Sequence, residues 1–272
     1  MTDSKNLISL FNNSKYYSLK YKNYFPIYEK LFSRFKNRKV TFVEIGVFSG
    51  GSLFMWKNFF GKDSRIIGID LNPDAKQFEK YGFEIFIGNQ SSKIFWKNFF
   101  DKVGNIDILL DDGGHTNYQQ IITCCSCIPY FNDDGILAVE DVYHSYVKKN
   151  FFNPSKYSFI NFCKKIIDDI NYRFPELPKF KYSLNHYVYS VEFFESFVAM
   201  NINKKLCKIK NEVLYNKGIN ILAKDLTHVH NENIPGSNSL ILKLKKIHKS
   251  FRGNFKYLVF IINTFILKKY FK

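Results

Sequence analysis

The stretch Val43-Glu44-Ile45-Gly46-Val47-Phe48-Ser49-Gly50-Gly51-Ser52 decides how the rest of the chain is interpreted. A short β-branched run, 40–45, ends at a glycine-rich turn, and a helix-like stretch, 52–60, follows. Glycines at such a turn let the backbone approach a ligand, and the next helix offers free N–H groups at its N-terminus. The spacing is G-x-x-x-G-G, which is neither the G-x-G-x-x-G of dinucleotide-binding turns nor the GK[ST] of a P-loop. The stretch therefore predicts the first strand, turn and helix of an α/β ligand-binding domain.

The same alternation continues toward the C-terminus. Further strand-like runs lie at 65–69, 84–87, 106–110 and 136–139, and helix-like stretches lie between them at 73–81, 92–100 and 116–130. Apolar strands that alternate with helices predict βαβ units with right-handed crossovers. A helix-like stretch at 155–172 is followed by two strand-like runs, 187–193 and 197–202, joined by a short polar turn. We expect an α/β fold with a Rossmann-like, doubly wound, mostly parallel sheet, closed by an antiparallel hairpin.

Charge divides the chain into parts. Residues 38–142 carry ten Lys or Arg against fourteen Asp or Glu, a net charge of −4, whereas residues 207–272 carry thirteen against three, a net charge of +10. We expect a helical N-terminal extension at 1–37, a ligand-binding domain at 38–206 and a basic C-terminal extension at 207–272. A protein that binds nucleic acid needs Lys and Arg along its working groove. Because the central part is acidic, we expect no nucleic-acid partner.

Several features bear on location. The five cysteines, three of them at 124, 125 and 127, do not form a disulfide framework, which indicates a reducing compartment. The N-terminus lacks the apolar region of a secretory signal, and the longest apolar run, 257–267, is about half of the ~20 residues that a membrane span needs. We expect a cytoplasmic protein. The basic and apolar tail 240–272 could lie at the inner face of an anionic membrane, or it could pack on the domain or in a homo-oligomer interface.

Polar residues follow the second and third predicted strands. Ligands of open α/β sheets bind at the carboxyl ends of the strands. Asp70 ends the second strand, where its carboxylate can accept hydrogen bonds from ribose hydroxyls, and the side chains of Gly88-Asn89-Gln90-Ser91 could frame an adenine edge. Asp70 could also cap the next helix, and a glycine turn can be only a turn. Together, in order on successive strands, these features predict a nucleoside-type pocket.

Four carboxylates end the next two strands. Asp111 and Asp112 follow one strand, and Glu140 and Asp141 follow the other. Carboxylates this close repel one another unless a positive group lies among them, and a hard divalent ion such as Mg²⁺ prefers oxygen ligands. Asp-Asp-Gly-Gly is also a good turn or helix cap, and Glu140-Asp141 could be a solvated loop.

The motifs E-I-G-x-x-x-G-G-S, I-G-I-D and G-N-Q-S resemble those of class I S-adenosylmethionine (SAM)-dependent methyltransferases. The segments 107–115, which contains D-D-G-G-H, and 139–141 are similar to the metal-dependent macrolide-sugar O-methyltransferases of the mycinamicin and macrocin type. Bacterial relatives are often labelled cephalosporin hydroxylases, a label that the methyltransferase motifs do not support. The resemblance covers about 38–206, and Gly-Gly stands where the family more often has Gly-Ser before the histidine.

The resemblance implies two cofactors, SAM and a divalent metal ion, with Mg²⁺ favoured. The cofactor-binding residues that we expect are Glu44, Gly46, Ser49, Gly50, Ser52, Asp70, Gln90, Ser91 and Asp111, and the expected metal ligands are Asp112, Glu140 and Asp141. The ion would bind two neighbouring hydroxyls of the substrate and lower the pKa of one. His115 corresponds to the general base, although it could be a helix N-terminal residue with no role in proton transfer. His144 and Tyr146 could reach the substrate.

A sugar with adjacent hydroxyls is the acceptor that the resemblance implies. Abundant Lys, Phe, Tyr, Asn and Ile together suggest an AT-rich genome, which argues against a macrolide-producing actinomycete. We therefore expect an acceptor in a bacterial capsule or lipopolysaccharide glycan, or its nucleotide-sugar precursor. Three alternatives stay open: methylation of a phosphorylated or amidated group on such a glycan, such as a phosphoramidate; methylation of a catechol; and a non-catalytic SAM-binding scaffold.

Overall fold

The computed structural model describes residues 6–147, 156–174, 183–214 and 216–219. The chain divides into two compact units, Met1–Glu212 and Val213–Lys272, and every described strand lies in the first. The basic tail 240–272 lies outside the described residues, so its expected role at a membrane or subunit surface stays a prediction. Within the described ranges, no helix combines the length and the apolar character that a membrane crossing requires.

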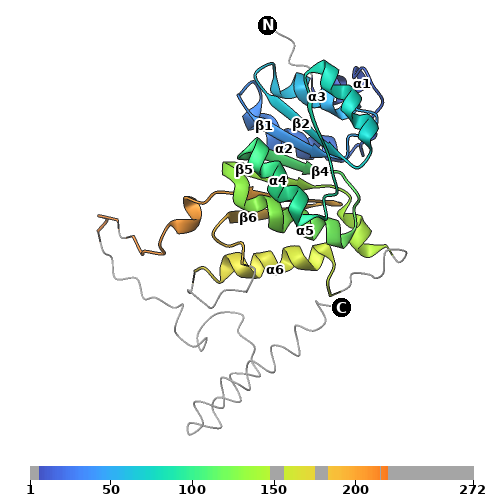
Figure 1. Ribbon diagram of the computed structural model, residues 1–272. Helices are drawn as coiled ribbons and strands as arrows, with labels where there is room; N and C mark the ends of the chain where they lie inside the picture. The colour runs from blue at the N-terminus through green and yellow to red at the C-terminus, as the bar shows by residue number, and fades with distance from the viewer. Residues whose placement is uncertain (1–5, 148–155, 175–182, 215, 220–272) are drawn as a thin grey trace, which may run out of the picture. The chain divides into compact units, whose positions relative to one another are not determined.

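A seven-stranded sheet forms the centre of the first unit (Figure 1). Its strands are β1 (Thr41–Ile45), β2 (Arg65–Asp70), β3 (Glu84–Ile87), β4 (Ile106–Asp111), β5 (Phe131–Val139), β6 (Val188–Phe194) and β7 (Phe197–Ile202), in the order β3-β2-β1-β4-β5-β7-β6. The first five are parallel, and β7 runs antiparallel to both β5 and β6. The predicted parallel sheet with a closing antiparallel hairpin is therefore confirmed. The strand order switches direction between β1 and β4, where open α/β sheets bind their ligands.

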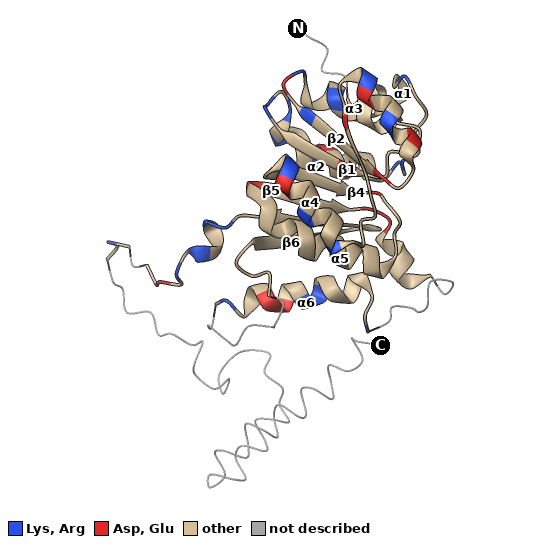
Figure 2. Ribbon diagram, in the orientation of Figure 1, with Lys and Arg blue, Asp and Glu red and all other residues tan. Residues whose placement is uncertain are grey.

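Helices cover both faces of the sheet. One face packs against α4 (Lys93–Val103), α5 (Asn117–Cys127) and α6 (Phe159–Asn171), and the other against α1 (Leu7–Asn12), α2 (Tyr24–Phe32) and α3 (Gly51–Phe60). Side chains of a strand alternate between faces, so Val43 and Ile45 join the core around Trp96 while Phe42 joins the core around Trp56. Charged residues lie mainly on the helices and connecting loops (Figure 2). Burial on both faces explains why the parallel strands are almost continuously apolar in sequence.

Several elements differ from the sequence pattern. The helix predicted at 116–130 ends at Cys127 and is followed by the 3-10 helix η3 (Ile128–Tyr130), and the helix predicted at 155–172 begins at Phe159. The stretch predicted as a helix at 73–81 is the 3-10 helix η2 (Pro73–Tyr81), which ends at Gly82 with φ 84°. Strand β5 begins at Phe131, before the predicted residue 136. The strand starts with the buried Phe131, and residues 132–134 after it are polar. Tertiary partners satisfy the two aspartates: Asn203 donates from Nδ2 to Asp134, and the backbone N–H of Lys204 donates to Asp133. Asn203 and Lys204 directly follow β7, about seventy residues further along the chain, so the sequence around β5 does not predict these contacts.

The segment between α1 and α2 crosses the N-terminus of α3. The Gly51 N–H donates to the carbonyl of Tyr17 at 3.2 Å, and Ser14 Oγ donates to the carbonyl of Gly51 at 2.6 Å. A Cβ at Gly51 would lie 2.2 Å from the carbonyl oxygen of Tyr16, so only glycine permits this approach. This contact brings residues 18–21 to the carboxyl edge of the sheet. The expected boundaries 1–37, 38–206 and 207–272 stay a prediction.

Candidate active site

A cavity of about 750 Å³ lies at the carboxyl ends of β1, β2, β4 and β5. Its wall includes the turn after β1, which begins at Gly46, and the turn after β4, which begins at Asp112. The two turns touch: Asp112 N–H donates to the Ile45 carbonyl at 3.1 Å, and a Cβ on Gly46 would lie 2.1 Å from the Asp112 carbonyl oxygen. Gly46 also has φ +93°, so glycine is required here both because a Cβ has no room and because the backbone conformation is left-handed.

Asp70 fixes the glycine turn from the neighbouring strand. Its Oδ2 accepts hydrogen bonds from the N–H groups of Val47 (2.8 Å) and Phe48 (3.2 Å), and its Oδ1 accepts from the N–H of Asn72 (2.9 Å). The cap of the following 3-10 helix is the side chain of Asn72, which accepts from Asp74 N–H. Asp70 also lines the cavity, so it stands where a ribose could reach its oxygens.

Some expected cofactor-binding residues lie outside the cavity lining. Gly46, Ser52, Asp70 and Gln90 line it, whereas Glu44, Ser49, Gly50, Ser91 and Asp111 are not among the lining residues. Glu44 is buried and accepts hydrogen bonds from Ser52 Oγ (2.6 Å) and Trp56 Nε1 (3.2 Å), and burial raises its pKa. Gly50 caps α3 with φ +78°. The part of these residues in cofactor binding stays a prediction.

Gln90, which lines the cavity, is hydrogen-bonded to the buried Asp111. Gln90 Nε2 donates to both oxygens of Asp111 (2.9 and 3.1 Å), and Gln90 Oε1 accepts from the N–H of Gly114 (2.9 Å). Burial raises the pKa of Asp111 to about 6, against the opposing effect of the hydrogen bonds from Gln90 and Gly113. Gln90 thus positions the loop 112–115 from below. Ser91 bonds locally, donating from Oγ to Asn89 at 2.6 Å.

A lysine from the N-terminal segment lies among three of the carboxylates. Lys20 Nζ is 2.7 Å from Asp112 Oδ2, 3.3 Å from Glu44 Oε1 and 3.3 Å from Glu140 Oε2, and its side chain is 1% exposed. Burial by itself lowers the pKa of Lys20, but the three carboxylates raise it well above its usual value. The buried hydroxyl of Tyr28 also donates to Glu140. Glu140 Oε1 therefore accepts from both Lys20 and Tyr28, and Glu140 Oε2 accepts from Lys20.

Three residues could hold a metal ion. Asp112, His115 and Asp141 each place one ligand atom within 4.8 Å of the others. His115 Nε2 is 3.5 Å from Asp141 Oδ2 and 3.9 Å from Asp112 Oδ1, and His115 Nδ1 is buried without a hydrogen-bond partner. Tyr24 donates from its hydroxyl to Asp141 Oδ1 at 2.7 Å. Two carboxylates and an imidazole form a donor set that suits a divalent ion. Of the expected ligands, Asp112 and Asp141 belong to this set, and the place of Glu140 in it stays a prediction.

Lys20, Tyr24 and Tyr28 were not among the residues predicted from the sequence. Tyr24 and Tyr28 lie one turn apart on α2, so their shared face follows from helical spacing. Their partners, Asp141 and Glu140, lie more than a hundred residues away, and no local motif connects them. Only the packing of the N-terminal segment brings them together.

A second cavity, of about 640 Å³, adjoins the first. Tyr21 and Tyr24 line both cavities. Its other lining residues include Tyr143, Tyr146, Phe193 and Phe194, so it is rich in aromatic rings. His144 lies beside it, with its ring stacked on His115 at a centroid distance of 5.3 Å, and burial lowers the pKa of His144. His144 therefore contacts the expected base, and Tyr146 faces the neighbouring cavity.

Comparison with known proteins supports the resemblance inferred from the motifs. No family model matches the chain. It is 29% identical over 158 residues (55% of this chain) to an 8-demethyl-8-α-L-rhamnosyl tetracenomycin-C 2′-O-methyltransferase of Streptomyces olivaceus, and 30% identical over 128 residues (44% of this chain) to the mycinamicin VI 2″-O-methyltransferase of Micromonospora griseorubida. These matches span 41% and 32% of the relatives' length, so the chain corresponds to less than half of each.

A solved structure shares the fold. The mycinamicin-pathway methyltransferase MycE, in complex with Mg and S-adenosylhomocysteine (SAH), is similar with a TM-score of 0.64 at 21% identity. The similarity covers 73% of this chain and 55% of that protein. The chain thus has the Rossmann-like methyltransferase fold.

Proposed function

We propose that this chain is a SAM-dependent O-methyltransferase that methylates a sugar hydroxyl with the help of a divalent ion. The observation that carries the proposal is the cluster of Asp112, His115 and Asp141, which lies in the same cavity as the glycine turn and Asp70. Both relatives are named as O-methyltransferases, one of them of a rhamnosyl compound, and MycE was solved with Mg and SAH. A cofactor turn and a metal-binding cluster in one cavity are the two parts that such a reaction needs.

The cofactor end of the cavity lies along β1 and β2. SAM would lie against the turn that starts at Gly46, with its ribose toward the carboxylate of Asp70, because a carboxylate oxygen can accept more than one hydrogen bond. Asp70 keeps this acceptor capacity although backbone N–H groups already use both of its oxygens. Gln90 fixes the loop 112–115 against this end, which couples the cofactor side of the cavity to the metal side.

The metal end of the cavity handles the proton. Asp112 and Asp141 would hold the ion, and a bound divalent ion lowers the pKa of a hydroxyl that it contacts. His115 would accept the hydroxyl proton at Nε2, and SAM, when bound, would supply the methyl group to the hydroxyl oxygen and leave as SAH. Tyr24 keeps Asp141 in place through its hydroxyl. Because His115 could instead be a third ligand, metal affinity and turnover have to be measured separately.

The acceptor would enter from the aromatic cavity. Sugar hydroxyls would lie beside His115 and Asp141, and the apolar faces of the sugar and its neighbour would contact the rings of Tyr21 and Tyr146. The compositional bias of the chain supports an acceptor in a bacterial capsule or lipopolysaccharide glycan, or its nucleotide-sugar precursor. Contact with the inner face of a membrane through 240–272 belongs to the same proposal.

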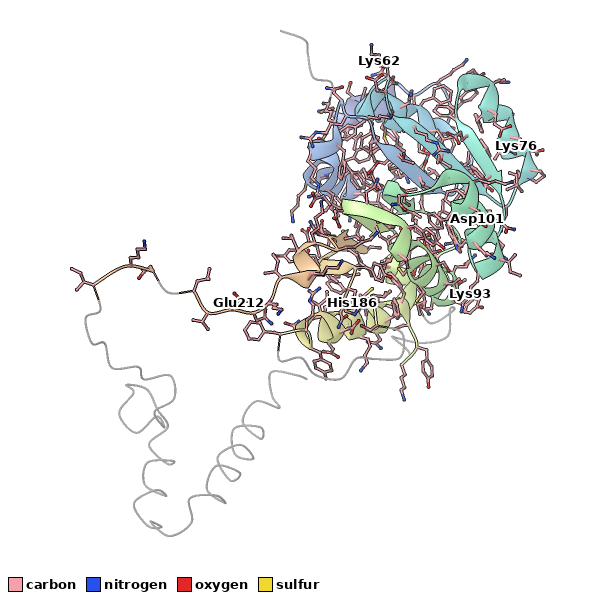
Figure 3. The ribbon with its side chains drawn as sticks, turned by 60° about the vertical axis from the view of Figure 1, so that its left-hand side comes forward. Lys62, Lys76, Lys93, Asp101, His186 and Glu212 are labelled. Atoms are coloured by element: carbon pink, nitrogen blue, oxygen red, sulfur yellow. The ribbon has the colours of Figure 1, made fainter. Side chains whose placement is uncertain are left out.

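Calorimetric titration tests the proposal in two stages. SAM and SAH are titrated into the protein with Mg²⁺ and again with EDTA, and micromolar binding is expected. Absence of binding under both conditions would refute the methyltransferase assignment. Sugars and nucleotide-sugars are then screened for SAH release, with His115→Asn as the test variant and His186→Asn as its control, because His186 is exposed and lines neither cavity (Figure 3). His115→Asn should lose about 10²–10⁴-fold in turnover and still bind SAM and metal.

A further inference from the structure

We propose that Lys20 is a resident cation of this site that competes with the divalent ion for Asp112 and Glu140, and so limits how tightly the site binds metal. The inference rests on the proposed function, because it presumes that the carboxylates bind a divalent ion. It concerns a residue of the N-terminal segment that lies outside every motif of the methyltransferase domain.

The position of Lys20 differs from that of an ordinary lysine. Lys62, Lys76 and Lys93 are exposed at the periphery of the molecule (Figure 3), whereas the Lys20 side chain is 1% exposed. Its ammonium makes three ion pairs, the shortest of them, 2.7 Å, with Asp112. A buried ammonium is tolerated only when it is paired, and three carboxylates pair with Lys20 here.

Asp112 takes part both in the ion pairs of Lys20 and in the cluster that could hold a metal ion. Its Oδ2 contacts Lys20, while its Oδ1 faces His115 in the cluster that could hold a metal. A carboxylate that already pairs with an ammonium attracts a second cation less, and the two cations also repel each other across a few ångströms. Glu140 is engaged in the same way, since both of its oxygens accept from Lys20. A divalent ion must therefore share Asp112 with Lys20 or displace it.

The fold holds Lys20 in place. The segment that carries it is fixed to the N-terminus of α3 by the hydrogen bonds of Ser14 and Tyr17 with Gly51. Lys20 therefore stays at a high effective concentration beside the carboxylates. The opposite role, in which Lys20 arranges the carboxylates for the ion, would make its removal weaken metal binding. Whether metal affinity rises or falls when Lys20 is removed therefore distinguishes the two roles.

The test measures Mn²⁺ affinity, by calorimetry and by the loss of the free-ion electron paramagnetic resonance signal. Lys20→Met should bind Mn²⁺ at least about tenfold more tightly than the wild type, because a nearby like charge has been removed. Lys20→Arg keeps the cation and should stay close to the wild type. Lys22→Met is the matched control: it removes an exposed lysine of the same segment and should change nothing. Equal or weaker binding by Lys20→Met would overturn the inference.

Loss of a buried cation could prevent folding, so a second variant is included. The double variant Lys20→Met/Glu44→Gln removes one charge of each sign, and the amide oxygen of the new glutamine still offers an acceptor to Ser52. It should bind Mn²⁺ more tightly than Glu44→Gln alone, which lacks the same carboxylate but keeps Lys20, and equal or weaker binding by the folded double variant would equally overturn the inference. If the wild type binds metal and the folded Lys20 variants do not gain affinity, the inference fails and the proposed function stands. If no folded chain, variant or wild type, binds metal, the metal-assisted mechanism fails as well.

Discussion

Replacement of Gly46 by alanine should damage both the fold and the metal-binding loop. The added Cβ would lie 2.1 Å from the carbonyl oxygen of Asp112 and 3.0 Å from its carbonyl carbon. Both atoms belong to backbone, so the turn after β1 or the turn after β4 must move. Gly46 also has φ +93°, which L side chains rarely adopt. Gly46→Ala therefore combines a conformational cost with a steric one.

Gly82 offers a matched control, because only the conformational part applies there. It has φ +84°, and a Cβ would meet nothing within 4 Å. Gly82→Ala should lower the free energy of unfolding by about 1–2 kcal/mol, the cost of a left-handed conformation for a residue with a Cβ. Gly46→Ala should lower it by a further ~1–3 kcal/mol, the usual cost of an overpacked site.

Urea denaturation followed by circular dichroism measures both variants. SAM and Mn²⁺ titrations on the folded Gly46→Ala protein should then show weakened binding of both ligands, because the turn touches Asp112 directly. Gly82→Ala should bind both ligands normally. If Gly46→Ala is no less stable than Gly82→Ala and binds both ligands as the wild type does, the turns after β1 and β4 are not in tight contact.

Three further predictions concern buried polar groups. Tyr28→Phe removes the hydroxyl donor to Glu140 and should lower the free energy of unfolding by about 1.5–3 kcal/mol in urea melts, whereas a loss below about 0.5 kcal/mol would argue against the buried contact. Burial raises the pKa of Asp111 to about 6, so the folded state binds this proton more tightly than the unfolded state does. As the pH rises from 4 to 6, the free energy of unfolding should therefore decrease by about 3 kcal/mol from this residue. Asp111→Asn, melted in EDTA beside the wild type, should lose that part of the pH dependence, and an unchanged pH profile would contradict the prediction. Burial raises the pKa of all five cysteines, Cys124, Cys125, Cys127, Cys163 and Cys207. Thiol titration at pH 8 should therefore show slow alkylation of the native protein and five reactive thiols after unfolding. Rapid labelling of Cys124 or Cys163 in the native protein would refute their burial.

The order of strands and helices was already determined by the sequence. Each parallel strand is buried on both faces and therefore reads as an apolar run, and each crossover needs a helix, so the alternation from 40 to 139 leaves few other topologies. The residues at the strand ends followed from the same reasoning, because a parallel sheet collects its carboxyl ends at one edge. Gly46, Asp70, Asp112 and Asp141 all lie at such strand ends in the sequence, and all four line one cavity.

Only the tertiary structure decided how the charges in that cavity are compensated. Lys20 and Tyr28 reach Asp112 and Glu140 across roughly a hundred residues of chain, and nothing near Lys20 in the sequence distinguishes it from the exposed Lys22. A motif records residues whose spacing is set by one strand or one helix turn, whereas an ion pair between distant segments depends on how they pack. The ion pairs of Lys20 with the carboxylates therefore follow only from the packing of the N-terminal segment across α3.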